Sequence, residues 1–297
     1  MNFKSFLERI QNKVNDSLPG DLRADLKAVQ KNNGAVYTGL FLADGGALSD
    51  APFPASPIVY MEDYYKRYRD APEDDPGIES TAEEITGILM QGMENAPDVG
   101  NITDYQEVKD RIIGRMIGYD SNLMILEQMV HRPYLDMAIV FFVLVGSFEH
   151  SVGFVPVTKA LMNIWEVTEE EILKTAVRNT EWLMGEKIIR FDDLVECDRE
   201  KGLTGGMYVL SNRQNYFGAS VLLYSQSLKT LAEALNADIY ILPASVHEVI
   251  LMPKADQNLQ SLQETVKHVN EAEVRTEDVL TDSVYLYHRD SGEIEIM

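Results

Sequence analysis

The sequence predicts an α+β fold, in which a helix-rich N-terminal part packs on a mainly antiparallel C-terminal sheet with flanking helices. Up to about residue 130, apolar residues recur mostly at the three- and four-residue spacing of a helix face. After that point, short runs rich in valine, isoleucine and tyrosine alternate with amphipathic stretches in a βαββα order, which favours antiparallel pairing. We therefore expect a helix-rich part with one hairpin over residues 1–130 and an α+β domain with an antiparallel sheet over residues 131–297.

The N-terminal part opens with an amphipathic helix, whose apolar face consists of Phe3, Phe6, Leu7, Ile10 and Val14. Residues 34–46 then alternate between apolar and polar types and end in glycines, which is typical of a strand entering a hairpin. Residues 56–68 begin with an extended Ser-Pro and carry tyrosines four apart, so they predict a short strand followed by a helix whose tyrosines face the core.

Two more helices are expected before residue 130. The first covers about residues 81–95 and follows an acidic linker, rich in proline and glycine, at 71–80. The second covers 103–118, where Thr103 can cap the start and the apolar residues from Val108 to Met116 form a buried stripe.

The middle of the chain changes to strands. Two apolar, β-branched runs at 134–145 and 151–157 are expected to pair in a buried sheet. Two helices follow, one capped by Thr158 and one with a capping box formed by Thr168 and Glu171. The polar residues that come next are interpreted as a surface loop over 185–206.

The last third has the clearest patterns. One continuous helix is predicted over 217–236, another over 258–273, and a hairpin with its turn near Gly292 closes the chain. Three single strands are expected at 207–212, 238–243 and 247–253.

Charge and composition narrow the function classes. The 297 residues include 48 Asp plus Glu against 26 Lys plus Arg, for a net charge of −22. Because phosphate contacts need clustered cations, we expect no binding of nucleic acid, and a partner protein should present a basic contact surface. The longest apolar run, residues 137–146, is about half the length of a membrane span, so no membrane association is expected.

Several observations favour the cytoplasm. The N-terminal helix carries charges throughout and has no hydrophobic core of a secretory signal. Cys197 is the single cysteine, so neither a disulfide framework nor a cysteine-based zinc cluster can form. Its acidic surroundings would also raise a thiol pKa, which disfavours a nucleophilic role.

His247 and Glu248 are the pair that most suggests chemistry. A zincin motif needs a second histidine four residues after the first, and that position holds Leu251. In a strand the two side chains would also point to opposite faces, so we expect neither a metal nor a cofactor. The favoured interpretation places His247 at the start of a strand, half exposed or hydrogen-bonded to a loop.

Polar residues at strand ends leave one catalytic alternative open. Ser245, His247 and Asn212 are weak candidates for a catalytic cleft, because sites often lie where strands end. The stretch 131–136 also places Arg132 near Asp136, and we interpret them as an ion pair that braces the entry to a strand.

Five segments, in this order, resemble a known family: SPIVYMEDYY, HRPYLDMAIVF, AVRNTEW, MYVLSN followed by GA, and LPASVHEVILMP. Together they are similar to the bacterial domain-of-unknown-function family DUF5688, which occurs in gut Gram-positive bacteria and on their mobile elements. The resemblance implies a bacterial cytoplasmic protein that a mobile element can carry. Since no activity is assigned to that family, it implies no catalytic residues.

Two hypotheses for the function follow. The first is an uncharacterised non-catalytic binding or regulatory protein, because the motifs form no catalytic triad, metal cluster or phosphate loop. The alternative is a hydrolase-like enzyme with a cleft near Ser245, His247 and Asn212. A ring of His247 bonded to a nucleophile or an acid in a pocket would favour the enzyme.

Overall fold

The computed structural model describes residues 1–43, 57–72, 75–94, 100–148, 151–194, 206–255 and 258–297. The chain divides into two compact units. The first comprises Met1–Val99 and Val145–Gly153, and the second comprises Gly100–Leu144 and Phe154–Met297. The division predicted at residue 130 lies within the second unit, between a short helix and a strand.

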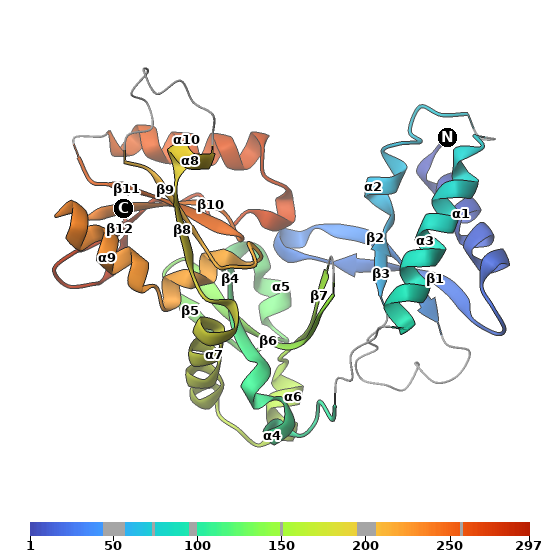
Figure 1. The fold of residues 1–297 in the computed structure, drawn as a ribbon, viewed down its shortest axis with the longest axis horizontal. Coiled ribbons are helices and arrows are strands. Elements are labelled where there is room, and N and C mark those ends of the chain that lie inside the picture. The colour runs from blue at the N-terminus through green and yellow to red at the C-terminus, as the bar shows by residue number, and fades with distance from the viewer. Residues whose placement is uncertain (44–56, 73–74, 95–99, 149–150, 195–205, 256–257) are drawn as a thin grey trace. The chain divides into compact units, whose positions relative to one another are not determined.

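The first unit is a three-stranded antiparallel sheet with helices on it (Figure 1). Its strands follow the order β1-β2-β3. Its elements are α1 (Phe3–Ser17), β1 (Arg23–Gln30), β2 (Val36–Ala43), β3 (Ile58–Tyr60), α2 (Met61–Tyr65) and α3 (Gly77–Glu94).

The predicted opening helix is confirmed. Asn2 caps α1 by accepting a hydrogen bond from the backbone of Ser5, and the side chains of Phe6, Ile10 and Val14 are fully buried. They pack in one core with apolar residues of α3, including Leu89. The short strand followed by a helix, predicted at 56–68, is also confirmed as β3 and α2.

β2 pairs antiparallel with β3, the next strand, and this unit also contains a hairpin that the sequence did not predict. β2 pairs with the preceding strand β1 through a turn in which Asn33 and Gly34 have positive φ, as Asn-Gly turns favour. The sequence did not predict β1, because RADLKAVQ has one β-branched residue and charges on its exposed side, and strands are usually rich in β-branched residues. The turn expected after β2 lies outside the described residues.

The second unit contains two antiparallel sheets, apart from residues 145–153, which count with the first unit. One has six strands in the order β13-β12-β10-β11-β9-β8; in the other, β6 lies between β4 and β5 and also pairs with β7. Their strands are β4 (Ile112–Gly118), β5 (His131–Tyr134), β6 (Met137–Phe148), β7 (Ser151–Pro156), β8 (Lys187–Arg190), β9 (Tyr208–Ser211), β10 (Ile239–Ser245), β11 (Glu248–Pro253), β12 (Tyr285–Tyr287) and β13 (Ile294–Ile296). The α+β class with mainly antiparallel sheets is therefore confirmed.

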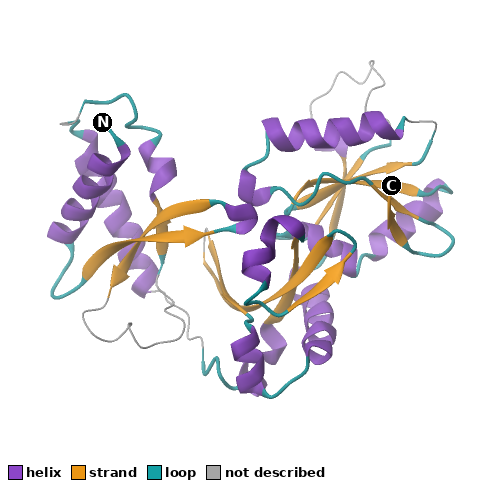
Figure 2. Cartoon of the chain, turned by 180° about the vertical axis from the view of Figure 1, so that it is seen from behind, coloured by secondary structure: helices purple, strands orange, loops and turns teal. Residues whose placement is uncertain are grey.

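Helices cover both faces of the six-stranded sheet. Helix α10 lies across one face, as Figure 2 shows, and its Val266 packs on Tyr240 and Leu286. Residues of α9 and of the 3-10 helix η5 (Gly218–Leu223) pack with the other face, where Ile241 and Leu251 are fully buried. The helices are α4 (Tyr105–Val108), α5 (Leu123–Leu126), α6 (Lys159–Trp165), α7 (Glu169–Met184), α8 (Phe191–Leu194), α9 (Gln226–Leu235) and α10 (Leu259–Ala272).

The single helix predicted over 103–118 is wrong. Only α4, capped by Asp104 instead of Thr103, and a 3-10 turn at Lys109–Arg111 form there, and the chain then enters β4. All seven residues of β4 are buried, so the strand shows none of the alternation that marks a half-buried strand. Its apolar residues fit a helical stripe equally well, and the sheet around them decided between the two.

Helix α7 covers the edge of β4 that does not pair with β6. The Gly114 N–H donates to the Thr180 hydroxyl at 2.8 Å, and the Asn179 side chain donates to the Ile112 carbonyl at 3.0 Å. Backbone groups of an exposed strand edge would otherwise pair with another chain or stay unsatisfied. The AVRNTEW segment therefore has a structural role in closing this edge.

Two further predictions are corrected. The helix expected over 217–236 is broken at Ser225, which caps α9 by accepting from the backbone of Leu228, so η5 and α9 are separate. The loop expected over 185–206 begins with β8 and α8 instead, and residues 195–205 lie outside the described ranges.

The remaining local predictions are confirmed. Thr158 caps α6, and Thr168 with Glu171 forms the capping box of α7. β6 pairs with β7, and the closing hairpin β12–β13 has Gly292 at positive φ in its turn. Within the described ranges, no helix combines the length and the apolarity needed to cross a bilayer.

Candidate functional site

The turn between β10 and β11 carries His247. A bulge between Pro243 and Ser245 ends β10, and Val246 with His247 forms the turn itself. The Ser245 hydroxyl accepts a hydrogen bond from the backbone N–H of His247 at 3.0 Å, which tightens the turn. The His247 side chain is 27% exposed, so its ring lies at the edge of the protein interior.

Both ring nitrogens of His247 are held by the protein. The backbone N–H of Phe217 donates to Nδ1 at 3.1 Å, so Nδ1 carries no proton. Nε2 then carries the hydrogen and lies 3.1 Å from a carboxylate oxygen of Asp278. The expected hydrogen bond to a loop is therefore confirmed.

Asn212, the second candidate, holds a loop in shape. Its side chain is fully buried, and its amide nitrogen donates to the Tyr216 carbonyl at 2.8 Å. Its oxygen accepts from the backbone of Gln214 at 3.1 Å and of Tyr216 at 3.3 Å. These bonds close residues 212–217 into a compact loop, in which Asn215 and Phe217 have positive φ.

The loop meets the His247 turn in very close contact. The Ser211 hydroxyl donates to the His247 carbonyl at 2.8 Å. A Cβ added to Gly218 would lie 2.0 Å from the Ser211 hydroxyl and 2.3 Å from the His247 carbonyl oxygen. Glycine is therefore the residue that this junction admits. The fold thus brings the elements that carry Ser245, His247 and Asn212 together, while the ring of His247 bonds Phe217 and Asp278.

Sequence patterns did not single out Arg115, the most unusual residue of this region. It lies in the middle of β4 and is 5% exposed. Its guanidinium carbon lies 3.5 Å from the centroid of the Phe154 ring, 4.2 Å from that of Phe217 and 4.3 Å from that of Phe142. An arginine within an apolar run is expected on the exposed side of a helix. No local sequence pattern therefore indicated that Arg115 is buried.

The guanidinium of Arg115 is not satisfied by hydrogen bonds. Its Nε and Nη2 atoms are buried and have no hydrogen-bond partner among the described residues. Burial lowers the pKa of the Arg115 guanidinium to about 9, since desolvation disfavours the charged form. Buried charges in proteins are normally paired, so this arrangement calls for an explanation.

His247 and Arg115 belong to one group of rings. The His247 ring lies 5.5 Å from each of the Tyr216 and Phe217 rings, and Tyr216 stacks on Phe154 at 5.8 Å. We call this group the Arg115 cluster; it consists of Arg115, Phe142, Phe154, Tyr216, Phe217 and His247.

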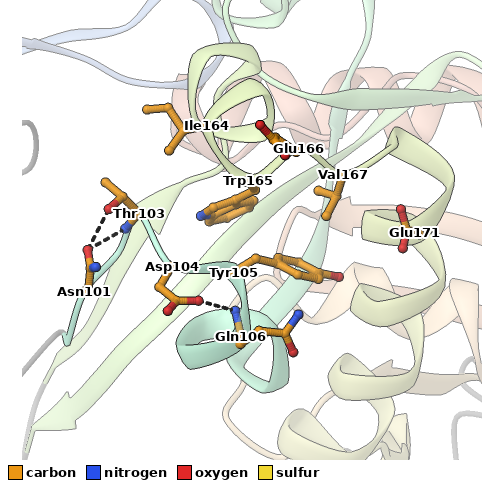
Figure 3. Close-up of a pocket in the computed structure, with 10 residues that line it drawn as sticks. All are labelled: Asn101, Thr103, Asp104, Tyr105, Gln106, Ile164, Trp165, Glu166, Val167 and Glu171. Atoms are coloured by element: carbon orange, nitrogen blue, oxygen red, sulfur yellow. Dashed lines mark hydrogen bonds between the residues drawn. The ribbon is translucent and has the colours of Figure 1, made fainter.

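A pocket of about 610 Å³ lies elsewhere in the second unit, where α4, α6 and α7 meet (Figure 3). Trp165 and Tyr105 form its aromatic part, with ring centroids 5.6 Å apart. The Trp165 indole N–H donates to the Ile102 carbonyl at 2.9 Å, which fixes its ring. The lining residues are Asn101, Thr103, Asp104, Tyr105, Gln106, Ile164, Trp165, Glu166, Val167 and Glu171.

Three carboxylates line this pocket, and they differ in what they bond. Asp104 accepts from the Gln106 backbone at 2.8 Å, and Glu171 belongs to the capping box of α7. Glu166 is exposed, and its carboxylate has no partner among the described residues. Glu166 is therefore the carboxylate of the pocket that is available to a ligand.

The chain was compared with protein families, with curated proteins and with solved structures. A family model described as a family of unknown function, DUF5688, matches residues 3–289. The chain belongs to the DUF5688 family. No curated protein and no solved structure matches it.

The HRPYLDM segment of this DUF5688 protein differs from expectation. Arg132 does not pair with Asp136; it bonds Glu169 at 2.7 Å and Glu170 at 3.1 Å in the first turn of α7. Asp136 accepts hydrogen bonds from hydroxyl groups instead, among them that of the fully buried Tyr285. The dipole of α7 favours carboxylates in its first turn. Glu169 and Glu170 lie far from Arg132 in the sequence, so local spacing could not predict that they pair with it.

Two further candidates from the sequence concern a metal site and Cys197. Among the described residues of this DUF5688 protein, no group of three or more His, Cys, Asp or Glu could hold a metal ion. Cys197 lies outside the described residues.

Proposed function

We propose that this DUF5688 protein is a non-catalytic binding or regulatory protein, whose partner is a protein with a basic contact surface. The pocket beside Trp165 carries this proposal, because an aromatic part with three carboxylates complements a lysine or arginine side chain. Glu166 supplies a carboxylate without a partner among the described residues, so it can pair with a cation at little cost.

The charge of the whole chain supports the same partner. A net charge of −22 attracts basic surfaces and repels nucleic acids and anionic lipids. We extend the proposal to a bacterial cytoplasmic protein, which a mobile element can encode and which binds neither nucleic acid nor membrane.

The hydrolase-like alternative has less support from the geometry. A general base needs a ring nitrogen within hydrogen-bond reach of a nucleophile. His247 does bond an acid, because its Nε2 lies 3.1 Å from Asp278, but the Phe217 N–H occupies Nδ1, neither contact is with a nucleophile, and the pocket beside Trp165 does not include His247. The Ser245 hydroxyl bonds the backbone of His247 instead of its ring.

A capture experiment from a lysate of the native host tests the binding proposal. Glu166→Lys places a cation in the pocket, and Glu273→Lys makes the same charge change at the exposed end of α10. We expect a basic protein to be retained by the wild type and by Glu273→Lys, and to be lost with Glu166→Lys. Retention should also weaken as salt screens the charges. Equal retention by all three proteins at every salt concentration would contradict the proposal.

The alternative is tested separately by assaying the wild type and His247→Gln on a panel of simple esters and amides. Hydrolysis by the wild type that the substitution abolishes, with the fold retained in circular dichroism, would favour the enzyme over the binding protein.

A further inference from the structure

Arg115 carries a charge that the protein itself leaves unpaired. Removing a guanidinium from water is costly unless hydrogen bonds or an opposite charge replace the water. The ring centroids of Phe154, Phe217 and Phe142 lie within 4.3 Å of its carbon, and these rings supply cation–π attraction. None of these rings offers an oxygen or nitrogen acceptor, so Nε and Nη2 stay without a conventional hydrogen bond.

The two unsatisfied atoms form one recognition element. Nε–H and one Nη2–H of a guanidinium point in parallel along the same edge, and this edge matches two oxygens of a carboxylate or a phosphate. The surrounding rings cover this edge but offer it no oxygen or nitrogen acceptor, so it can bind a ligand once a covering ring moves. The side chains of the Arg115 cluster thus fix the orientation of an unused bidentate donor.

Tyr216 is the exposed ring of the Arg115 cluster, so its movement would open a path from solvent to Arg115. Its side chain is 37% exposed, its ring lies 5.3 Å from the guanidinium carbon, and it stacks on Phe154 at an interplanar angle of 19°. It belongs to the loop that Asn212 closes, between Asn215 at φ 50° and Phe217 at φ 49°. These left-handed conformations are uncommon for residues other than glycine, and they cluster where segments act on ligands.

We propose that Arg115 is the anchor of a binding site for a small molecule with a carboxylate or phosphate group on a flat apolar body. The ring of Tyr216 swings away, the anion pairs with Nε and Nη2 of Arg115, and the flat body stacks on Phe154 in place of the tyrosine. His247 and its partner Asp278 lie beyond Tyr216 and Phe217, and the bond from the Phe217 N–H to His247 keeps the base of the loop in place. This site is separate from the pocket beside Trp165.

Thermal unfolding of the full chain tests the site with four probes: benzoate, phenyl phosphate, inorganic phosphate and benzyl alcohol. A ligand that binds the native state raises the melting temperature with its concentration. We expect benzoate or phenyl phosphate to raise it, benzyl alcohol to leave it unchanged, and inorganic phosphate to act more weakly because it lacks the flat body. The stronger of the two aromatic anions identifies the preferred anionic group.

Three variants identify the residues responsible. Arg115→Met should weaken binding of the aromatic anion at least about tenfold, and Arg115→Lys should weaken it as well, because an ammonium lacks the bidentate edge. Tyr216→Ala removes the exposed cover and should bind the same anion more tightly than the wild type. Glu273→Lys, a charge change at the exposed end of α10, should leave anion binding unchanged. The test uses no residue of the pocket beside Trp165, so it and the test of the basic partner can fail independently.

Two outcomes would overturn the proposal. One is an equal response of the wild type and Arg115→Met to the aromatic anions. The other is the lack of any response of both the wild type and Tyr216→Ala to every anion up to about 10 mM, a concentration that largely fills a site of millimolar affinity. Since Tyr216 is exposed, its substitution keeps the test valid if the buried variants do not fold.

Discussion

At the scale of single residues, replacing Arg115 should change the free energy of unfolding by a measurable amount. We predict that Arg115→Met raises the free energy of unfolding of the ligand-free protein by about 1–3 kcal/mol, because methionine fills much of the same volume without a buried unpaired charge. The lost cation–π attraction, about 0.5–2 kcal/mol, offsets part of this gain. Urea unfolding of both proteins in buffer without carboxylate or phosphate measures the difference.

A clear loss of stability in Arg115→Met would mean that the cation–π attraction of the rings outweighs the cost of burying the unpaired charge. In that case no ligand would be needed to explain why Arg115 is buried. Arg115→Lys is the matched control, since it keeps a charge that burial disfavours and should not gain stability in the same way.

Gly218 is a second position where one residue decides the packing. We predict that Gly218→Ala destabilises the protein by about 3 kcal/mol or more, since the new methyl group would overlap the Ser211 hydroxyl and the His247 carbonyl. Gly87 is the control: it is exposed within α3, and nothing lies within 4 Å of an added Cβ. Gly87→Ala should therefore stabilise by about 0.5–1 kcal/mol. Thermal unfolding of both variants would show opposite shifts, and two shifts of the same sign would contradict the model of the junction.

At the scale of elements, the edge of β4 depends on hydroxyl and amide groups of α7. We predict that Thr180→Val costs about 1–3 kcal/mol, because it keeps the shape of the side chain and leaves the buried Gly114 N–H without its acceptor. Thr86→Val is a matched control, since the Thr86 hydroxyl bonds the Ala82 carbonyl one turn earlier in its own helix. That change should stay within about 0.5 kcal/mol.

Hydrogen exchange locates the effect within the element. In Thr180→Val the amide of Gly114 should exchange faster than the amides of β4 that pair with β6. Unchanged protection of Gly114 would show that the contact with α7 does not hold this edge.

At the scale of the whole molecule, buried tyrosines set an alkaline limit to stability. Burial is the first cause of the raised pKa values of Tyr134, Tyr224 and Tyr285, and the hydrogen bond to Asp136 adds to it for Tyr285. An unfolded chain releases these protons near pH 10, while the native state retains them. Their contribution to stability is therefore fully present below about pH 10 and is lost as the pH rises above it.

Spectrophotometric titration checks this expectation. Of the 14 tyrosines, Tyr134, Tyr224 and Tyr285 should ionise only together with the loss of the native circular dichroism spectrum. Ionisation of all 14 in one step near pH 10, with the native spectrum retained, would contradict it.

Sequence patterns predicted the elements whose caps, turns or buried faces depend on residues only a few positions apart. The capping box of Thr168 and Glu171 and the turn near Gly292 depend on residues a few positions apart, so short segments are sufficient to identify them. The buried face of α1 follows from helical periodicity in the same way. The strand predicted at 247–253 and the bond of His247 to a loop also follow from the pattern around it, although the strand begins at Glu248 and His247 itself lies in the turn.

The tertiary structure decided what depends on distant neighbours. β4 is a strand because β6 pairs with it and α7 covers its edge, although its apolar residues also fit a helix. Likewise, Arg115 is recognisable as a candidate site only when Phe142, Phe154 and Phe217, from three different parts of the chain, surround it. The sequence by itself determined the α+β class, the acidic charge, the local caps and turns, and the membership in DUF5688. Strand edges and the unpaired guanidinium arise from contacts between residues far apart in the chain, and no local pattern encodes such contacts.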